Sequence, residues 1–358
     1  MIRPAKYSDF EAIKHIFEVA FSEEYRQRGL DIVDRINRWQ QLYPVVKLLA
    51  SFNNPYQHLF NVHVYEDEEE KKIVGLIQIS ARSKDQTRWH VENIAVLPDQ
   101  RGKGIAKKIL NHIFDTYTEK GVNRFTLEVD INNASAIKLY ESIGFRIYTT
   151  IHYFKIPAKK LADFRQGTIT LPEGFRISKA SDTQMLMDLY TACTPSSIRI
   201  VDQKNLSDFH DTPIEQVSKY IKEYTKRCNQ MHFVIEKENS IIASLEIIAQ
   251  HRKLPHVLRL LVHPGYEHLN EDLILYAFNV LADYPDRSVL IAASEHQKAK
   301  LGIIKKLKLK SVSSDYLMVK DNLQIVKLPE ASSEIMMKDK KTFKPIFSKK
   351  DYAVRKDT

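Results

Sequence analysis

The stretch from residue 89 to residue 114 constrains the fold of this chain more than any other. An alternating apolar run over residues 89–97 ends at a proline, and a helical apolar pattern begins at Ile105. Between them lies a basic turn made of Arg101, Gly102, Lys103 and Gly104. The first N–H groups of a helix lack intrahelical partners and carry partial positive charge, so this turn suits an anion. Glycine allows close approach to the backbone, and two cations favour a pyrophosphate over a carboxylate.

Periodicity predicts a mixed α/β order for the first half of the chain. A strand at residues 2–4 precedes a helix capped by Ser8-Asp9, and a second helix is expected over about residues 30–50. Three strands, a helix, a strand, a helix and a strand should then follow. Their expected ranges are 59–65, 73–80, 89–97, 104–120, 125–130, 133–142 and 145–156.

Two sequence blocks resemble the GNAT superfamily of acyl-CoA-dependent N-acetyltransferases. The family's motif Arg/Gln-x-x-Gly-x-Gly/Ala is matched by Arg101, Gly104 and Ala106. The block from Asn133 to Phe145 resembles the second signature of the family and follows about 30 residues later. The resemblance covers roughly residues 1–156. It implies a mixed sheet in which two neighbouring strands splay apart, with the pantetheine arm of acetyl-CoA in the gap.

The resemblance also implies how acetyl-CoA is held as co-substrate, without a metal. Backbone groups of Ile94, Ala95 and Val96 would pair with the pantetheine amides, and the Val96 N–H would polarise the thioester oxygen. Asn133 would contact the CoA arm, although helix capping explains an asparagine there as well. The residues expected at the pyrophosphate are Arg101, Gly102, Lys103, Gly104, Ile105 and Ala106.

Acetyl transfer to an amine needs a base and an acid. A lysine-type amine with a pKa of ~10.4 is neutral in only one molecule in ~2,500 at pH 7, so a general base helps. Glu128 resembles the base of the ribosomal-protein N-terminal acetyltransferases, whereas Glu92 lies on the preceding strand, where other members carry theirs. Either could instead be a solvent-facing glutamate. Tyr140 is the expected general acid that protonates the departing thiolate. The alternative is that it is only a tyrosine packed in the core.

The pattern of the first half begins again after residue 174. Residues 175–182 echo residues 2–9, and residues 259–264 echo the strand end at 93–98. When the two prolines are aligned, Glu267-His268-Leu269-Asn270 falls opposite the basic turn, and Ile304 falls near the position of Tyr140. The repeat therefore keeps the architecture but loses the glycines, the cations and the acid.

The fold prediction is two tandem GNAT-like domains. The first, residues 1–156, is catalytic, and a linker over 157–174 leads to a degenerate GNAT-like domain over 175–321. That domain would pack against the first and shape the acceptor cleft. In GNAT relatives the segment between the first two helices lies over the acceptor site, here residues 23–28. The lysine-rich tail, 322–358, is either a docking arm or a frayed terminus.

Composition narrows the compartment and the partners. The 358 residues carry a formal charge of +9, but no arginine-rich run is interleaved with aromatics, which disfavours nucleic-acid binding. Cys193 and Cys228 form no CxxC pair, so neither a disulfide scaffold nor a zinc site is expected. Without a leader or an apolar run of ~18 residues, the sequence favours a cytoplasmic enzyme with no membrane partner. An internal duplication favours a monomer or a homodimer.

Three functions compete. The leading hypothesis is an N-acetyltransferase that moves acetyl from acetyl-CoA to a primary amine by direct attack in a ternary complex. The alternative is a non-catalytic acyl-CoA sensor or partner-binding scaffold, suggested by the degenerate half. A third has the basic surface recruit RNA or a ribosomal acceptor. The acceptor stays open among a peptide N-terminus, a polyamine, an antibiotic and a small metabolite.

Overall fold

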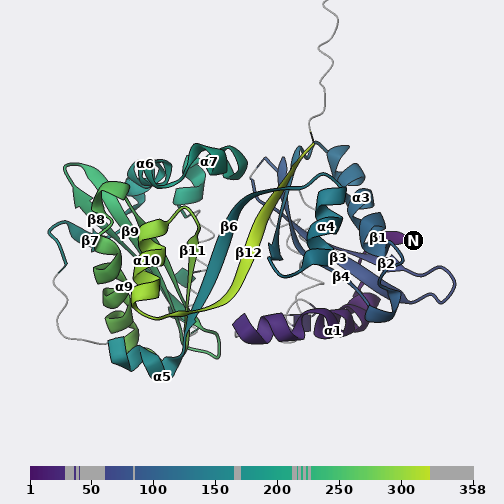
Figure 1. Ribbon diagram of the computed structural model, residues 1–358, viewed down its shortest axis with the longest axis horizontal. Helices are drawn as coiled ribbons and strands as arrows, with labels where there is room; N and C mark the ends of the chain where they lie inside the picture. The colour runs from purple at the N-terminus through teal and green to yellow at the C-terminus, as the bar shows by residue number, and fades with distance from the viewer. Residues whose placement is uncertain are drawn as a thin grey trace, which may run out of the picture. The chain divides into compact units, whose positions relative to one another are not determined.

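The computed structural model describes residues 1–28, 61–83, 85–164, 171–211 and 227–322, with isolated residues within 36–40 and 216–224. The first half follows the predicted order (Figure 1). Its elements are β1 (Ile2–Pro4), α1 (Phe10–Arg28), β2 (Val62–Glu66), β3 (Ile73–Ala81), β4 (Arg88–Val96), α3 (Ile105–Thr118), β5 (Arg124–Asp130), α4 (Ala134–Ser142) and β6 (Arg146–Ile156). The helix predicted over residues 30–50 lies almost entirely outside the described residues.

The second half repeats this order after a short helix α5 (Ala158–Leu161). Helix α7 follows the first helix of the repeat. The elements are β7 (Phe175–Ile177), α6 (Thr183–Cys193), α7 (Ser196–Asp202), β8 (Cys228–Lys237), β9 (Ser240–Gln250), β10 (His256–Val262), α9 (Leu269–Val280), β11 (Val289–Ser294), α10 (Lys298–Lys306) and β12 (Lys310–Asp321). The lysine-rich tail predicted over 322–358 lies, apart from its first residue, outside the described residues.

The twelve strands of the described residues belong to one sheet, in which the two halves exchange their last strands. The strand order is β1-β2-β3-β4-β5-β12-β6-β11-β10-β9-β8-β7. Strand β12 of the second half pairs with β5 on one side and β6 on the other, and β6 of the first half pairs with β11. Figure 1 shows β6 and β12 side by side in the middle of the sheet. The sequence repeat therefore does not coincide with the two halves of the sheet.

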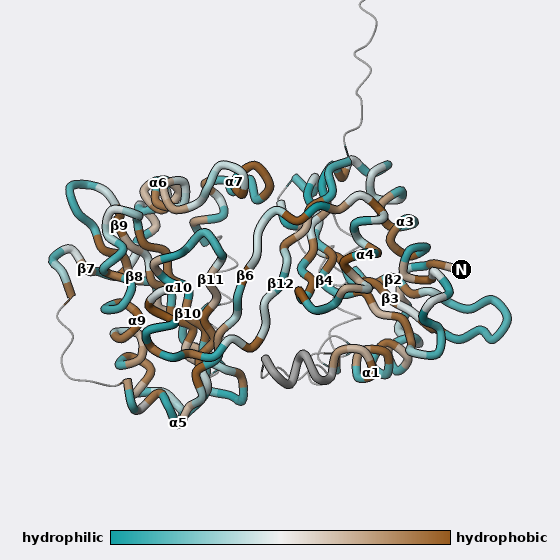
Figure 2. Tube along the Cα trace, viewed as in Figure 1, coloured by the Kyte–Doolittle hydropathy of each residue, from teal (hydrophilic) through white to brown (hydrophobic). Residues whose placement is uncertain are grey.

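Helices cover both faces of the first half of the sheet. The apolar stripe of α3 is buried with α4 against β4 and β5, as the helical pattern predicted. Helix α1 packs on the opposite face, where Phe10, Ile13, Ile16 and Phe17 are buried. Figure 2 shows apolar residues concentrated along the strands of both halves, with a paler trace along the exchanged strands β6 and β12. A cleft between β4 and β5 therefore lies between two packed layers.

An ionic cluster at the start of each half confirms that the two halves are structural repeats. Arg3 donates to Asp9 at 2.7 Å and to Glu66 at 2.7 Å. Arg176 donates to Asp182 at 2.7 Å and to the glutamate at position 236 at 2.6 Å. The hydrogen bonds from Arg176 lower the pKa of the Asp182 carboxyl. Each cluster ties the first strand to the first helical turn and to the second strand of its half.

Candidate active site

Strands β4 and β5 are paired only at their beginning and then diverge. Their parallel register joins residues 88–91 to residues 124–127 and stops there. Beyond Val91 and Leu127 both strands continue, β4 to Val96 and β5 to Asp130. A cavity of about 700 Å³ lies in the gap and is lined by both strands. The splay implied by the family resemblance is therefore present.

A β-bulge explains why β4 leaves its neighbour. In the register with β3, Gln78 pairs with Asn93 and Ile79 pairs with Val91, so the register skips Glu92. A bulge bends a strand and increases its local twist, and it also reverses the alternation of side chains between the two faces. Val91 and Val96 are five positions apart, a spacing that would place them on opposite faces of a regular strand. Because of the bulge, both reach the core beneath α3. The bend directs the later part of β4 away from β5.

Most of the residues expected to hold CoA line this cavity, but three do not. Ile94, Ala95, Val96, Arg101, Gly102, Ala106 and Asn133 are among the lining residues. Ile105, the first residue of α3, points into the core beneath the helix and has 5% of its surface exposed. Lys103 donates instead to Gln100 at 2.8 Å. Gly104 is the N-cap residue of α3.

The turn before α3 has the backbone geometry that glycine permits. Gly102 and Gly104 have φ angles of +80° and +74°, in the left-handed region that L side chains rarely adopt. A Cβ at either position would meet nothing within 4 Å, so the requirement comes from the backbone and not from crowding. Gly104 has no side chain with which to cap α3. The first N–H groups of the helix therefore suit an anion beside Arg101.

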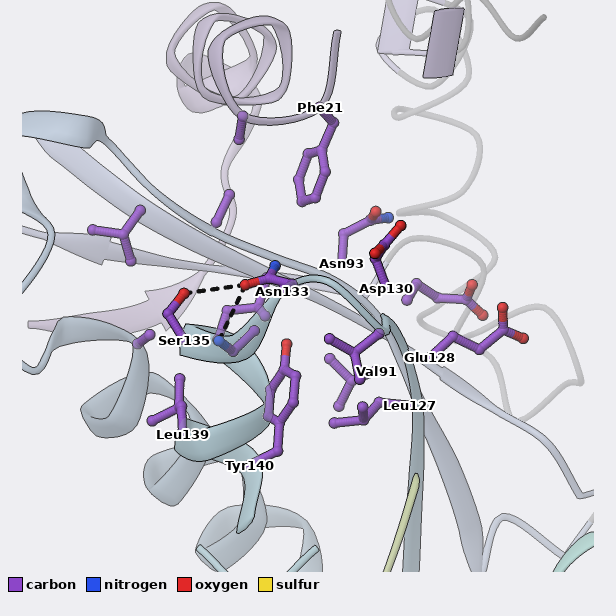
Figure 3. Close-up of a pocket in the computed structure, with 18 of the residues that line it drawn as sticks. Phe21, Val91, Asn93, Leu127, Glu128, Asp130, Asn133, Ser135, Leu139 and Tyr140 are labelled. Atoms are coloured by element: carbon purple, nitrogen blue, oxygen red, sulfur yellow. Dashed lines mark hydrogen bonds between the residues drawn. The ribbon is translucent and has the colours of Figure 1, made fainter. Parts of the chain in front are cut away.

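Tyr140 places a phenol hydroxyl at the cavity from α4 (Figure 3). It is the seventh residue after the helix cap Asn133, whose side-chain oxygen accepts hydrogen bonds from the Ala136 N–H and the Ser135 hydroxyl, both at 3.1 Å. Only 6% of the tyrosine surface is exposed, and burial raises the pKa of Tyr140 to about 12. The hydroxyl therefore keeps its proton throughout the neutral pH range.

The two candidate bases both line the cavity but are held differently. Glu92 accepts a hydrogen bond of 2.5 Å from Ser80 and forms an ion pair of 3.1 Å with Arg82. Glu128 accepts a hydrogen bond of 2.9 Å from the Tyr153 hydroxyl, a neutral donor. Figure 3 shows Glu128 extending from β5 on the far side of Val91 and Leu127 from Tyr140. A cation beside a carboxylate favours its charged form, and Arg82 supplies such a cation to Glu92.

Sequence reasoning missed several residues that line the same cavity, among them Phe21, His90, Asp130 and Asp315. His90 precedes Glu92 by two residues on β4. Because residues two apart on a strand tend to share a face, strand periodicity could have placed His90 near a candidate base. Burial lowers the pKa of His90 to about 4, and its Nδ1 lies 2.8 Å from the Thr126 hydroxyl. Asp315 comes from β12, and no local pattern could have placed it there.

Helix α1 also reaches the cavity. Ala20 and Phe21 line the cavity, and Figure 3 shows the Phe21 ring hanging from α1 towards the gap. The side chains of residues 23–28, which were expected over the acceptor site, lie outside the described residues.

The second half contains the same splay in a closed form. Strands β10 and β11 pair over residues 256–258 and 289–291 and then diverge, but the cavity beside them measures only about 60 Å³. Helix α9 begins five residues after its proline (264 to 269), whereas α3 begins seven residues after its own (98 to 105). The shorter interval leaves no counterpart of the glycine turn.

Lys300 fills the place where this second cleft would open. It is the third residue after Gln297, as Ala136 is the third after Asn133. Its side chain is 6% exposed and donates a hydrogen bond of 3.2 Å to the carbonyl oxygen of Leu260. Ile304, buried and seventh after Gln297, occupies the position that corresponds to Tyr140, as the alignment predicted.

Comparisons with known proteins agree with this geometry. Residues 32–145 match the model of the acetyltransferase (GNAT) family. The [ribosomal protein bS18]-alanine N-acetyltransferase of Escherichia coli is 47% identical over 53 residues, which is 15% of this chain and 36% of that protein. The spermidine N(1)-acetyltransferase of Vibrio cholerae is 26% identical over 109 residues, 26% of this chain and 62% of that protein. The chain thus spans only part of the length of these relatives.

Solved structures of the same architecture cover almost the whole chain. A GCN5-related N-acetyltransferase from Sphaerobacter thermophilus superimposes with a TM-score of 0.59 at 11% identity, over 92% of this chain and 97% of that one. A tandem GNAT protein from the clavulanic acid biosynthesis pathway gives 0.54 at 12% identity, over 90% and 99%. Residues 32–145 thus match the GNAT family model, and the chain as a whole has the fold of these solved GNAT structures.

No described helix is long and apolar enough to cross a membrane. Within the same residues, no group of three or more His, Cys, Asp or Glu side chains could hold a metal ion.

Proposed function

We propose that this protein is an acetyl-CoA-dependent N-acetyltransferase that acts on a primary amine by direct attack in a ternary complex. The observation that carries the proposal is the cavity between the splayed strands β4 and β5. This cavity is lined by the glycine turn at the N-terminus of α3, by the protonated phenol of Tyr140 and by the carboxylate of Glu128, which can accept a proton. Relatives named for acetylating an alanine of a ribosomal protein, spermidine and streptothricin support an amine acceptor, peptide or small molecule.

The residues around the cavity fit acetyl-CoA as co-substrate. The N–H groups at the start of α3 and the Arg101 guanidinium suit its pyrophosphate, because Gly102 and Gly104 leave the backbone open. The diverging edge of β4 from Ile94 to Val96 offers backbone groups to the pantetheine amides, as an added strand would. The Val96 N–H would then polarise the thioester oxygen.

Proton transfer is assigned to Glu128 and Tyr140. The acceptor ammonium must lose a proton before it can attack, and the Glu128 carboxylate is the group that accepts it. Glu92 is the weaker candidate because Ser80 and Arg82 already engage its carboxylate. The Tyr140 hydroxyl, kept protonated by burial, gives its proton to the departing thiolate. It recovers one from the attacking nitrogen, which loses its second proton as the amide forms.

The two halves of the chain divide these tasks. We assign acetyl-CoA binding and catalysis to residues 1–156, with 157–174 as linker. The domain over 175–321 shapes the acceptor side of the cleft, since Asp315 of β12 lines the cavity. Lys300 occupies the corresponding cleft of that domain, so a single acetyl-CoA site is expected. We place the protein in the cytoplasm.

A thiol-release assay with acetyl-CoA tests this function. The panel should contain an N-terminal alanine peptide, spermidine, an amino-sugar antibiotic and a free lysine derivative, and acetyl-CoA binding should be measured in parallel by calorimetry. Turnover on one class of amine would establish the enzyme and name its acceptor. No acetyl-CoA binding would refute the proposal, whereas tight binding without turnover on any amine would favour an acyl-CoA sensor.

A further inference from the structure

Tyr153 reaches Glu128 from a strand that is not the neighbour of β5. Its hydroxyl donates to Glu128 Oε2 at 2.9 Å. Tyr153 belongs to β6, and β12 lies between β6 and β5 in the sheet. Neighbouring strands are about 4.8 Å apart, so β5 and β6 are separated by about twice that distance. Only a long side chain can bridge such a gap.

The register fixes where this bridge can form. Glu128 is opposite Leu317 on β12, while Tyr153 is opposite Ser313, so the tyrosine reaches diagonally across the inserted strand. Register shifts on both sides, between Ser311 and Ser313 and between Leu317 and Met318, set the offset of β12 against β6. The second half of the chain, through β12, thus sets the distance between the tyrosine and the glutamate.

We propose that Tyr153 is a positioning residue for the base of the transfer reaction. The inference rests on the proposed function, in which Glu128 accepts the amine proton. The hydrogen bond fixes the carboxylate on the wall of the cavity and stabilises its charged form. Glu128 therefore stays ionised and ready to accept a proton at pH values where a carboxylate without this donor would already be partly protonated.

Other charged and titratable groups line the cavity with Glu128 or lie close to it. They are Arg82 just after β3, His90 and Glu92 on β4, Asp130 on β5, Tyr148 on β6 and Asp315 on β12. A change confined to the Tyr153 hydroxyl leaves all six in place. The Glu128 titration in such a variant is therefore compared with that of a control variant that keeps the Tyr153 hydroxyl.

The test compares Tyr153→Phe with Tyr316→Phe in the full-length protein. Tyr316 is a matched control because it lies on β12 opposite Val129 and packs in the core beneath α3, on the other face of the sheet. The Glu128 carboxyl is titrated by ¹³C NMR and assigned by its absence in Glu128→Gln. In parallel, kcat/KM for the best amine is measured against pH.

We expect the Glu128 titration in Tyr153→Phe to move up by about one pH unit, with the acid limb of kcat/KM moving by the same amount. Tyr316→Phe should leave both unchanged, and adding Tyr153→Phe to Glu128→Gln should change nothing further. An unmoved Glu128 titration in Tyr153→Phe, or an equal displacement in Tyr316→Phe, would overturn the inference. The NMR titration decides it even if no amine on the panel is turned over, an outcome that would count against the proposed function alone.

Discussion

Lys300 donates its hydrogen bond to the Leu260 carbonyl oxygen inside the splay of the second half, at 3.2 Å. Aligned on the two prolines, Leu260 corresponds to Ile94, whose backbone faces the open cavity of the first half. In the second half, the Lys300 side chain thus hydrogen-bonds a backbone carbonyl group of β10. In the first half, the corresponding edge of β4 stays available to a ligand. This contact explains why two similar halves enclose cavities of about 700 and about 60 Å³.

The buried amine of Lys300 should make stability depend on pH. Burial lowers its pKa from 10.5 to about 8, so the folded protein binds fewer protons than the unfolded chain between these values. The free energy of unfolding should therefore rise with pH from about 8 to 10.5, and below pH 8 the buried charge costs about 3 kcal/mol. Lys300→Met removes that cost but also the bond to Leu260, so we expect a net gain of roughly 2 kcal/mol at pH 7.

Urea unfolding of the wild type and the variant at pH 7, 9 and 10 measures this difference. Lys298→Met is the matched control, because Lys298 lies on the same helix but is exposed. The gap between wild type and Lys300→Met should narrow as the pH rises. A gap that is constant across the three pH values would show that Lys300 is not buried as a cation.

Much of the fold could be predicted from periodicity, because local pattern sets local structure. The apolar positions of α3 and the alternation along β4 and β5 gave these elements within a few residues of their observed ends. The echo of Arg3 in Arg176 also pointed to a repeat. The strand exchange could not be predicted, because β6 and β12 would read as edge strands of their own halves and pairing between distant strands leaves no local signal.

The candidate site divides in the same way. Tyr140 and the glycine turn belong to contiguous motifs, so a resemblance could locate them. The bulge at Glu92 depends on the register with β3, and the contact of Glu128 with Tyr153 depends on the insertion of β12, so neither could be read from a window of sequence. The burial of Lys300 could not be predicted either, because it depends on the packing of α10 against β10 and not on the sequence around the lysine.

Replacing Tyr140 by phenylalanine should separate turnover from binding. The phenol lines the cavity and stays protonated because its pKa is about 12, so the variant loses the proton donor but keeps the ring. We expect kcat to fall roughly 100-fold, with acetyl-CoA affinity changed less than about twofold. Tyr117→Phe is the control, since Tyr117 is buried in the same core and bonds Asn61. Equal losses in the two variants would remove Tyr140 from the chemistry.

Paired glutamine substitutions should identify the base. Glu128→Gln is expected to lower kcat/KM roughly 100-fold and to abolish the acid limb of its pH profile. Glu92→Gln should lower it less than about 10-fold, because that carboxylate is already engaged by Ser80 and Arg82. Steady-state kinetics from pH 5 to 9 compares the two. The reverse ranking would transfer the role of base to Glu92.

Two glycine-to-alanine substitutions test whether the turn before α3 binds the anionic part of acetyl-CoA. Gly104 has a φ of +74° and Gly121, just after α3, has +92°; a Cβ at either would meet nothing within 4 Å. Each alanine should therefore lower the free energy of unfolding by a similar amount, about 1 kcal/mol, through the backbone alone. Only Gly104→Ala changes the start of α3, where the proposed function places the pyrophosphate, so only this variant should weaken acetyl-CoA binding, by about 10-fold. Calorimetry with acetyl-CoA and with pantetheine, which has no pyrophosphate, separates the two effects. The loss of affinity should appear with acetyl-CoA and not with pantetheine. Equal weakening in Gly121→Ala would attribute the effect to general destabilisation of α3 and would count against the turn as the pyrophosphate site.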